Sequence, residues 1–321
     1  MQEGSRNAAA PRPDALGGIA AVVVGIVVLS VGSTIVKWSG ATGSVVAFWR
    51  LLVGAGIWFA VLGFRQVRIT AADLRRTVPV GMLFGFNISL FFTGVRMTRV
   101  ANVEFIGTLS PVLVVPAAAL LLGERIRGRI IGAGLVALGG VAIVLLGSPK
   151  VAGDDNVAGD LLAAGAVVTW SLYLLGAKRI RQTMDTKVFM AGMTLGAIVG
   201  AAPVAVGSGD LFGLDGRGWL TVGILAVLSG TVAHGCLTWA QRHLAVSTIA
   251  MMQLAQPGLA TLWAFLVLDE SIAAVQVAGM ALVVVGVGAI AVESSRPRSR
   301  PDATVRSAPG EPGVSPIGAE P

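Results

Sequence analysis

Two charged residues lie inside long apolar runs of this sequence. Arg50 belongs to the run 43–63, and Glu104 lies near the beginning of the run 100–122. Charged side chains within a membrane-spanning segment are rare and usually mark a substrate or ion pathway. Glu104 could bind a substrate ammonium group, carry a coupling proton or pair with Arg50. The alternatives are that Arg50 extends to the outer headgroups and that Glu104 has a structural partner inside the protein.

Two prolines occur about half-way along apolar runs, each after a polar residue. Ser110 precedes Pro111, Gln256 precedes Pro257, and Gln253 lies one helical turn earlier. A proline inside a helix removes a backbone hydrogen bond, and the freed carbonyl must face protein or a wet cavity when lipid surrounds the helix. These groups therefore predict a substrate site at the membrane midplane. The alternative is a kink that serves packing only.

Further candidates for the pathway are an imidazole, an amide and two aromatic rings. His234 could relay protons because histidine titrates near neutrality, although a buried neutral histidine with one hydrogen bond fits equally well. Asn87 occupies nearly the matching position in the other half of the chain. Trp170 and Tyr173 could offer stacking surface to a solute, or they could face lipid.

The composition sets the class of protein in which these residues act. Of 321 residues, 55% are hydrophobic and 13% charged, and the mean hydropathy is +0.80. Soluble domains carry about a quarter charged residues, so the sequence predicts an all-α polytopic membrane protein. The net charge of +7 is dispersed among short loops, which argues against a nucleic-acid partner. The single cysteine, Cys236, excludes an intramolecular disulfide.

Ten apolar runs are long enough to cross the bilayer, because a spanning helix needs about 20 residues. They lack the alternation of barrel strands. We expect helices at 16–36, 43–63, 77–95, 100–122, 129–147, 158–177, 187–207, 218–240, 246–268 and 273–293.

The distribution of basic residues predicts the orientation. Most of the 24 Lys and Arg residues fall in the tails and loops on the side of the N-terminus. Cytoplasmic loops are enriched in Lys and Arg. We therefore expect a multi-pass protein of the cell membrane with both termini in the cytoplasm.

The chain contains one apolar unit twice. The stretch from Ser110 to Glu124 is echoed from Gln256 to Glu270, with the proline and the glutamate equally far apart in both copies. Each copy holds five expected spans, an odd number, so the second copy must enter the membrane inverted. We expect Glu124 and Glu270 to cap the N-terminus of the helix that follows each of them.

This duplication divides the chain. We expect a cytoplasmic N-terminal tail at 1–15, a first repeat at 16–147, a linker at 148–157, a second repeat at 158–293 and a disordered cytoplasmic tail at 294–321.

The duplicated motifs resemble the two EamA repeats of the drug/metabolite transporter superfamily. The resemblance covers roughly residues 16–293 and implies a solute carrier, often an exporter of amino acids or other small metabolites. It also implies a central cavity. The segment Glu104-Phe105-Ile106-Gly107 is similar to one in the threonine/homoserine exporters of this superfamily. The motifs that carry the family resemblance are Leu109-Ser110-Pro111, Leu122-Gly123-Glu124 and Gly132, then Ala255-Gln256-Pro257, Leu268-Asp269-Glu270 and Gly279.

Inverted repeats are typical of secondary transporters. We therefore expect an exporter of a small metabolite, such as an amino acid, that works by alternating access as a monomer or homodimer. A proton gradient or solute exchange would drive it, and we expect no cofactor or metal. The competing hypotheses are a non-transport intramembrane protein, either a scaffold or an enzyme, and a solute channel. Two histidines and one buried carboxylate offer little of the acid, base and nucleophile that an enzyme needs.

Overall fold

The computed structural model describes residues 14–98, 100–146, 156–268 and 272–295, and across these ranges the chain forms helices and no strands. Glu270 and most of the predicted tails and linker lie outside them. The helices are α1 (Ala15–Ser30), α2 (Gly32–Ser39), α3 (Gly43–Phe64), α4 (Ala71–Met97), α5 (Val100–Gly107), α6 (Ser110–Leu122), α7 (Gly128–Leu146), α8 (Val157–Arg181), α9 (Thr186–Gly207), α10 (Gly216–Ile224), the π-helix η1 (Leu225–Ala233), α11 (His234–Ala240), α12 (Val246–Met252), the 3-10 turn η2 (Gln253–Ala255), α13 (Gln256–Leu268) and α14 (Ala274–Ser295).

The all-α membrane fold is confirmed. Within the described ranges, nine helical segments are long and apolar enough to cross a membrane, and Gly128–Val144 is a shorter apolar helix. Large apolar side chains cover the outside of the bundle; Leu120, Leu146 and Val284 are examples. Such a surface is stable only against lipid. The chain is therefore a multi-pass membrane protein.

Several spans are interrupted, and one is longer than expected. The first span breaks at Val31 between α1 and α2, and the fourth breaks between α5 and α6, just before Pro111. The third span, expected at 77–95, begins earlier because Thr70 and Asp73 form a capping box at the start of α4. A count of apolar residues alone misses this polar first turn.

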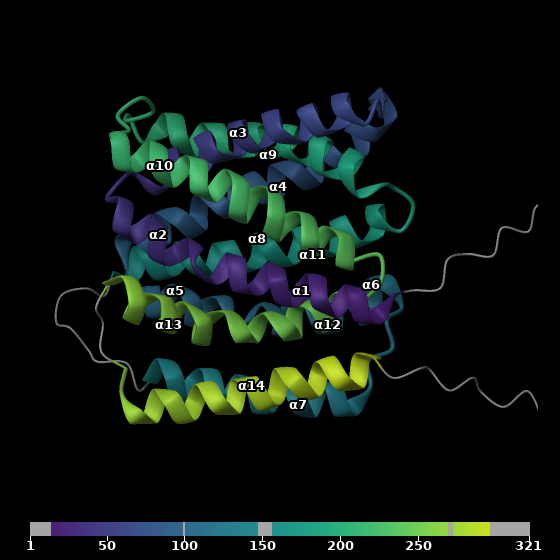
Figure 1. The fold of residues 1–321 in the computed structure, drawn as a ribbon, viewed down its shortest axis with the longest axis vertical. Coiled ribbons are helices and arrows are strands. Elements are labelled where there is room, and N and C mark those ends of the chain that lie inside the picture. Colours follow the sequence, from purple (N-terminus) through teal and green to yellow (C-terminus); the bar gives the residue numbers. More distant parts are fainter. Residues whose placement is uncertain (1–13, 99, 147–155, 269–271, 296–321) are drawn as a thin grey trace, which may run out of the picture.

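Small residues bring α4 and α9 into close contact. A Cβ atom added to Gly85 would meet the backbone of Ala197, and one added to Gly196 would meet the backbone of Val78. Only glycine allows two helix backbones to approach this closely. The glycine faces of these two helices thus pack inside the bundle, near the top of Figure 1.

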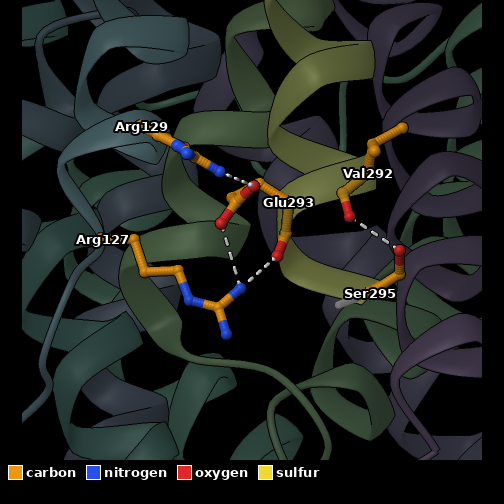
Figure 2. Close-up of polar contacts among 5 residues, drawn as sticks. All are labelled: Arg127, Arg129, Val292, Glu293 and Ser295. Atoms are coloured by element: carbon orange, nitrogen blue, oxygen red, sulfur yellow. Dashed lines mark hydrogen bonds and ion pairs between the residues drawn. The ribbon is translucent and has the colours of Figure 1, made fainter. Parts of the chain in front are cut away.

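The last helices of the two halves, α7 and α14, form an antiparallel pair at one edge of the bundle (Figure 1). A Cβ atom on Gly140 would lie 2.7 Å from the carbonyl oxygen of Gly279. At the other end, Arg127 Nη1 lies 3.2 Å from Glu293 Oε1 and donates to the Glu293 carbonyl at 2.7 Å (Figure 2). Arg129 Nη1 lies 3.9 Å from Glu293 Oε2. Opposite directions for these equivalent helices agree with an inverted repeat.

The predicted cap at Glu124 is wrong in its target. The carboxylate does not cap the following helix, α7; it accepts the backbone N–H groups of Val246, at 2.8 Å, and Ser247, at 3.2 Å. These residues begin α12, which lies in the other half of the chain. The carboxylate therefore ties one half of the bundle to the other.

Candidate functional site: a cavity between the two halves

A cavity of about 130 Å³ lies where the interrupted spans of both halves meet. Its walls come from α1 to α6, α8, the π-helix η1, α11, α12 and the segment around η2. The structure brings nearly all of the predicted pathway residues to it. Those that line the cavity are Arg50, Asn87, Glu104, Ser110, Pro111, Trp170, His234, Gln253, Gln256 and Pro257.

Arg50 reaches into this cavity from α3 and is 1% exposed. Its Nη1 donates to Ser229 Oγ at 2.9 Å, and its guanidinium carbon lies 5.1 Å from the centroid of the Phe92 ring. Its Nε and Nη2 have no hydrogen-bond partner in the described protein. Arg50 therefore does not extend to the outer headgroups. It is anchored on one side and open on the other.

Glu104 reaches the cavity from α5 and is 5% exposed. Its Oε1 has no hydrogen-bond partner among the described residues. Arg50 lines the same cavity, yet the ion pairs found within the described ranges do not include one between these two residues. The pairing that the sequence left open is therefore absent, and both charges remain available inside the cavity.

The amide and the imidazole have different surroundings. Asn87 Nδ2 donates to the Ala166 carbonyl at 2.6 Å, so this side chain braces α4 against α8. His234 packs edge-on against Phe84, with 4.7 Å between ring centroids. Its Nε2 has no partner in the part of the chain that the structure describes. Asn87 thus has a clear structural role, whereas His234 presents a free nitrogen.

Tyr173 does not line the cavity. It packs behind the wall, 5.2 Å from the Trp170 ring and 4.9 Å from the Phe84 ring by centroids. Trp170 alone of the two predicted rings faces the cavity. One turn separates them along the helix, so the apolar pattern of this segment did not distinguish the lining ring from the supporting one.

The polar residues next to the two prolines lie where the helices break. Ser110 and Pro111 begin α6 after the gap that follows α5. Gln253 belongs to the short 3-10 turn η2, and Gln256 begins α13. Ser110 Oγ and Gln253 Oε1 have no partner within the described ranges. Irregular backbone at membrane depth is tolerated where it lines a cavity, which fits this placement.

Sequence reasoning missed Ser229 and Ser33. Ser229 lies in the π-helix η1, which ends immediately before His234. Single π-turns inside helices often occur at functional sites, and here the π-helix presents Ser229 to Arg50. Nothing in the apolar run 218–240 indicates a π-turn. Ser33 stands at the break between α1 and α2 and lines the cavity.

Comparison with known proteins identifies the family. The model of the EamA-like transporter family matches residues 16–146 and 157–292. The chain belongs to this family. The two matches together cover most of the sequence, so the family assignment does not rest on the cavity.

Two relatives of this EamA family member are similar over most of their length. This chain is 28% identical over 257 residues to the aromatic amino acid exporter YddG of Ancylobacter novellus, and the aligned region covers 75% of this chain and 86% of the relative. It is 25% identical over 228 residues to an uncharacterized transporter of Clostridium kluyveri, covering 69% of this chain and 73% of the relative. A solved crystal structure at 23% identity superposes with a TM-score of 0.68, covering 86% of this chain and 97% of that one, and shows the same fold.

Proposed function

We propose that this EamA transporter is a secondary active exporter that moves a small amphipathic solute of the amino acid class out of the cell by alternating access. The observation that carries the proposal is a set of buried polar atoms around one cavity that have no partner in the described part of the chain. Arg50, Glu104, Ser110, His234 and Gln253 each contribute at least one. A buried polar group left unsatisfied costs about 1–3 kcal/mol, so a polar solute or water must supply the missing partners.

The arrangement of the walls supports alternating access. The cavity is lined by both halves of the chain, and the last helices of these halves run in opposite directions. In inverted-repeat transporters, substrate binds at the repeat interface near the midplane, where helices are discontinuous. Here the breaks before Ser110 and around Gln253 lie at the cavity.

The chemistry of the walls supports an amphipathic solute. Trp170, Phe91 and Phe92 provide apolar surface, while the charges of Arg50 and Glu104 provide polar ends. The cavity of about 130 Å³ is close to the roughly 150 Å³ that holds a benzene molecule. The name of one relative, an aromatic amino acid exporter, favours an amino acid over other solutes.

We further propose the setting of this activity. The protein lies in the cell membrane with both termini in the cytoplasm, as the basic residues predict, and works as a monomer or homodimer. Protons or a second solute molecule drive export. The division into repeats at 16–147 and 158–293 with a linker at 148–157 stays a prediction.

Export can be tested by comparing metabolites in the medium and in the cytoplasm of cells that lack or overproduce the protein. We expect overproducing cells to release one class of amino acid, and Glu104→Gln to abolish this release at normal membrane levels. Glu293→Gln is a matched control, because this carboxylate lies at the α7–α14 edge. No difference for any solute would favour a scaffold, and flux without stimulation by solute on the opposite side would favour a channel.

A further inference from the structure

Arg50 and Glu104 present opposite charges to one cavity without touching each other. In a low-dielectric interior two such charges attract strongly, and they would pair if their side chains could meet. They do not, because Arg50 is held by its hydrogen bond to Ser229 and by its contact with the Phe92 ring. Both side chains line the same cavity.

The free atoms of Arg50 form one edge of the guanidinium group. Nη1 is occupied by Ser229, while Nε and Nη2 have no partner within the described protein. These two nitrogens point their N–H groups in parallel, and this edge of arginine binds a carboxylate with two hydrogen bonds. The geometry thus favours a ligand carboxylate at Arg50 over a single-atom acceptor.

The free atom of Glu104 is an acceptor. Its Oε1 lacks a partner among the described residues, and so do Ser110 Oγ and Gln253 Oε1, which line the same cavity. An ammonium group carries three donors and no acceptor. The Glu104 oxygen can therefore accept a hydrogen bond from a ligand ammonium group.

We infer that the cavity binds free α-amino acids as zwitterions, with the carboxylate on the Nε and Nη2 edge of Arg50 and the ammonium group on Glu104. This inference rests on the proposed export function and names the groups that recognise the substrate. A zwitterion neutralises both charges at once. A solute with only one of the two groups leaves either Arg50 or Glu104 buried and unpaired, which is unfavourable, so the cavity selects against amines and carboxylic acids of the same size.

The first test uses the purified full-length protein in proteoliposomes. Each of the twenty common L-amino acids is assayed for counterflow, and the best substrate is then competed with its decarboxylated amine and with its deaminated acid. We expect both analogues to inhibit at least about tenfold more weakly than the amino acid. Equal inhibition by either analogue overturns the inference while leaving export intact. The absence of counterflow for all twenty amino acids overturns the proposed function as well.

The second test asks whether Arg50 binds the ligand carboxylate and Glu104 binds the ligand ammonium group. In an equilibrium binding assay, which does not depend on transport, Arg50→Gln should remove the preference over the amine but keep the preference over the acid, and Glu104→Gln should do the reverse. A merely structural residue would weaken both preferences equally or neither, and either result overturns the assignment. If Glu104→Gln keeps both preferences and loses only the response to a pH gradient, Glu104 carries a coupling proton instead. Should a variant fail to fold, the competition with the unmodified protein still decides the inference.

Discussion

The Glu124 carboxylate accepts the hydroxyl hydrogen bond of Ser247, with 2.6 Å between Oε2 and Oγ. Glu124 follows α6 in the first half of the chain, and Ser247 lies in the first turn of α12 in the second half. The same carboxylate also accepts the backbone N–H of Val246. A negative charge at a helix N-terminus satisfies unpaired N–H groups and complements the helix dipole. The contact fixes the N-terminus of α12, a helix that lines the cavity at Ala250.

We expect Glu124→Ala to lower the free energy of unfolding by about 1–2 kcal/mol, the usual cost of losing an N-cap. The melting temperature in detergent should fall accordingly. Lys187→Gln is a suitable control, because its ion pair with Asp185 lies at the surface and such pairs contribute little. Identical melting of Glu124→Ala and the unmodified protein would show that the contact does not stabilise the fold.

The glycine contacts between α4 and α9 give a second prediction. Gly85→Ala would press a methyl group against the backbone of Ala197, and overpacking of this kind costs about 1–3 kcal/mol. We expect a lower melting temperature and a lower yield of folded protein. Gly54→Ala in α3 is the matched control, because the added carbon meets nothing within 4 Å beyond the local backbone of its own helix and alanine favours helix. Equal losses for both variants would contradict close packing at Gly85.

The repeat geometry predicts opposite exposure for two equivalent turns. In a Cys236→Ser background, Arg125→Cys should react with a membrane-impermeant thiol reagent only after the cells are opened. Ala273→Cys should react in intact cells. These positions follow the first and the second copy of the duplicated motif. Labelling of both positions from the same side would contradict the inverted arrangement on which alternating access depends.

Much of this fold could be predicted from the sequence because the bilayer constrains it so strongly. The apolar runs locate the helices, and the rarity of charge inside them picks out Arg50 and Glu104. What failed was reasoning confined to neighbours along the chain. Glu124 was expected to cap the next helix, whereas its partners lie at Val246 and Ser247. Tyr173 and Trp170 share a helix, and only three-dimensional packing separates the supporting ring from the lining one.

Sequence reasoning left open whether Arg50 and Glu104 form an ion pair, because three-dimensional packing decides this too. The sequence pattern alone shows two opposite charges inside apolar runs, and it does not decide whether they pair. The structure adds Ser229, presented by a π-helix that no feature of the sequence indicates. Once Ser229 and Phe92 hold the guanidinium group, the two charges stay apart. A site of this kind depends on backbone irregularity, which apolar periodicity does not encode.

The loop between α11 and α12 supplies a pH-dependent contact. His243 Nδ1 accepts the backbone N–H of Asp14 at 3.2 Å, which requires that nitrogen to be unprotonated. Partial burial lowers the pKa of His243 from its ordinary value of 6.5, and although Asp14 raises it, the neighbouring cation Arg242 lowers it further. The folded protein therefore holds this imidazole neutral at a pH where the unfolded chain protonates it.

A base whose pKa is lowered by folding stabilises the folded state above its unfolded pKa and loses that contribution as the pH falls. We therefore expect the melting temperature of the unmodified protein to decline from about pH 6.5 downward, in part because Asp14 loses its acceptor. His243→Gln should lack the part of this decline that comes from His243. The difference in melting temperature between the unmodified protein and His243→Gln should therefore shrink as the pH falls from 8 to 5. His234 is present in both proteins and cancels from the comparison. A difference that stays constant across this range would show that the Asp14–His243 contact does not titrate with folding.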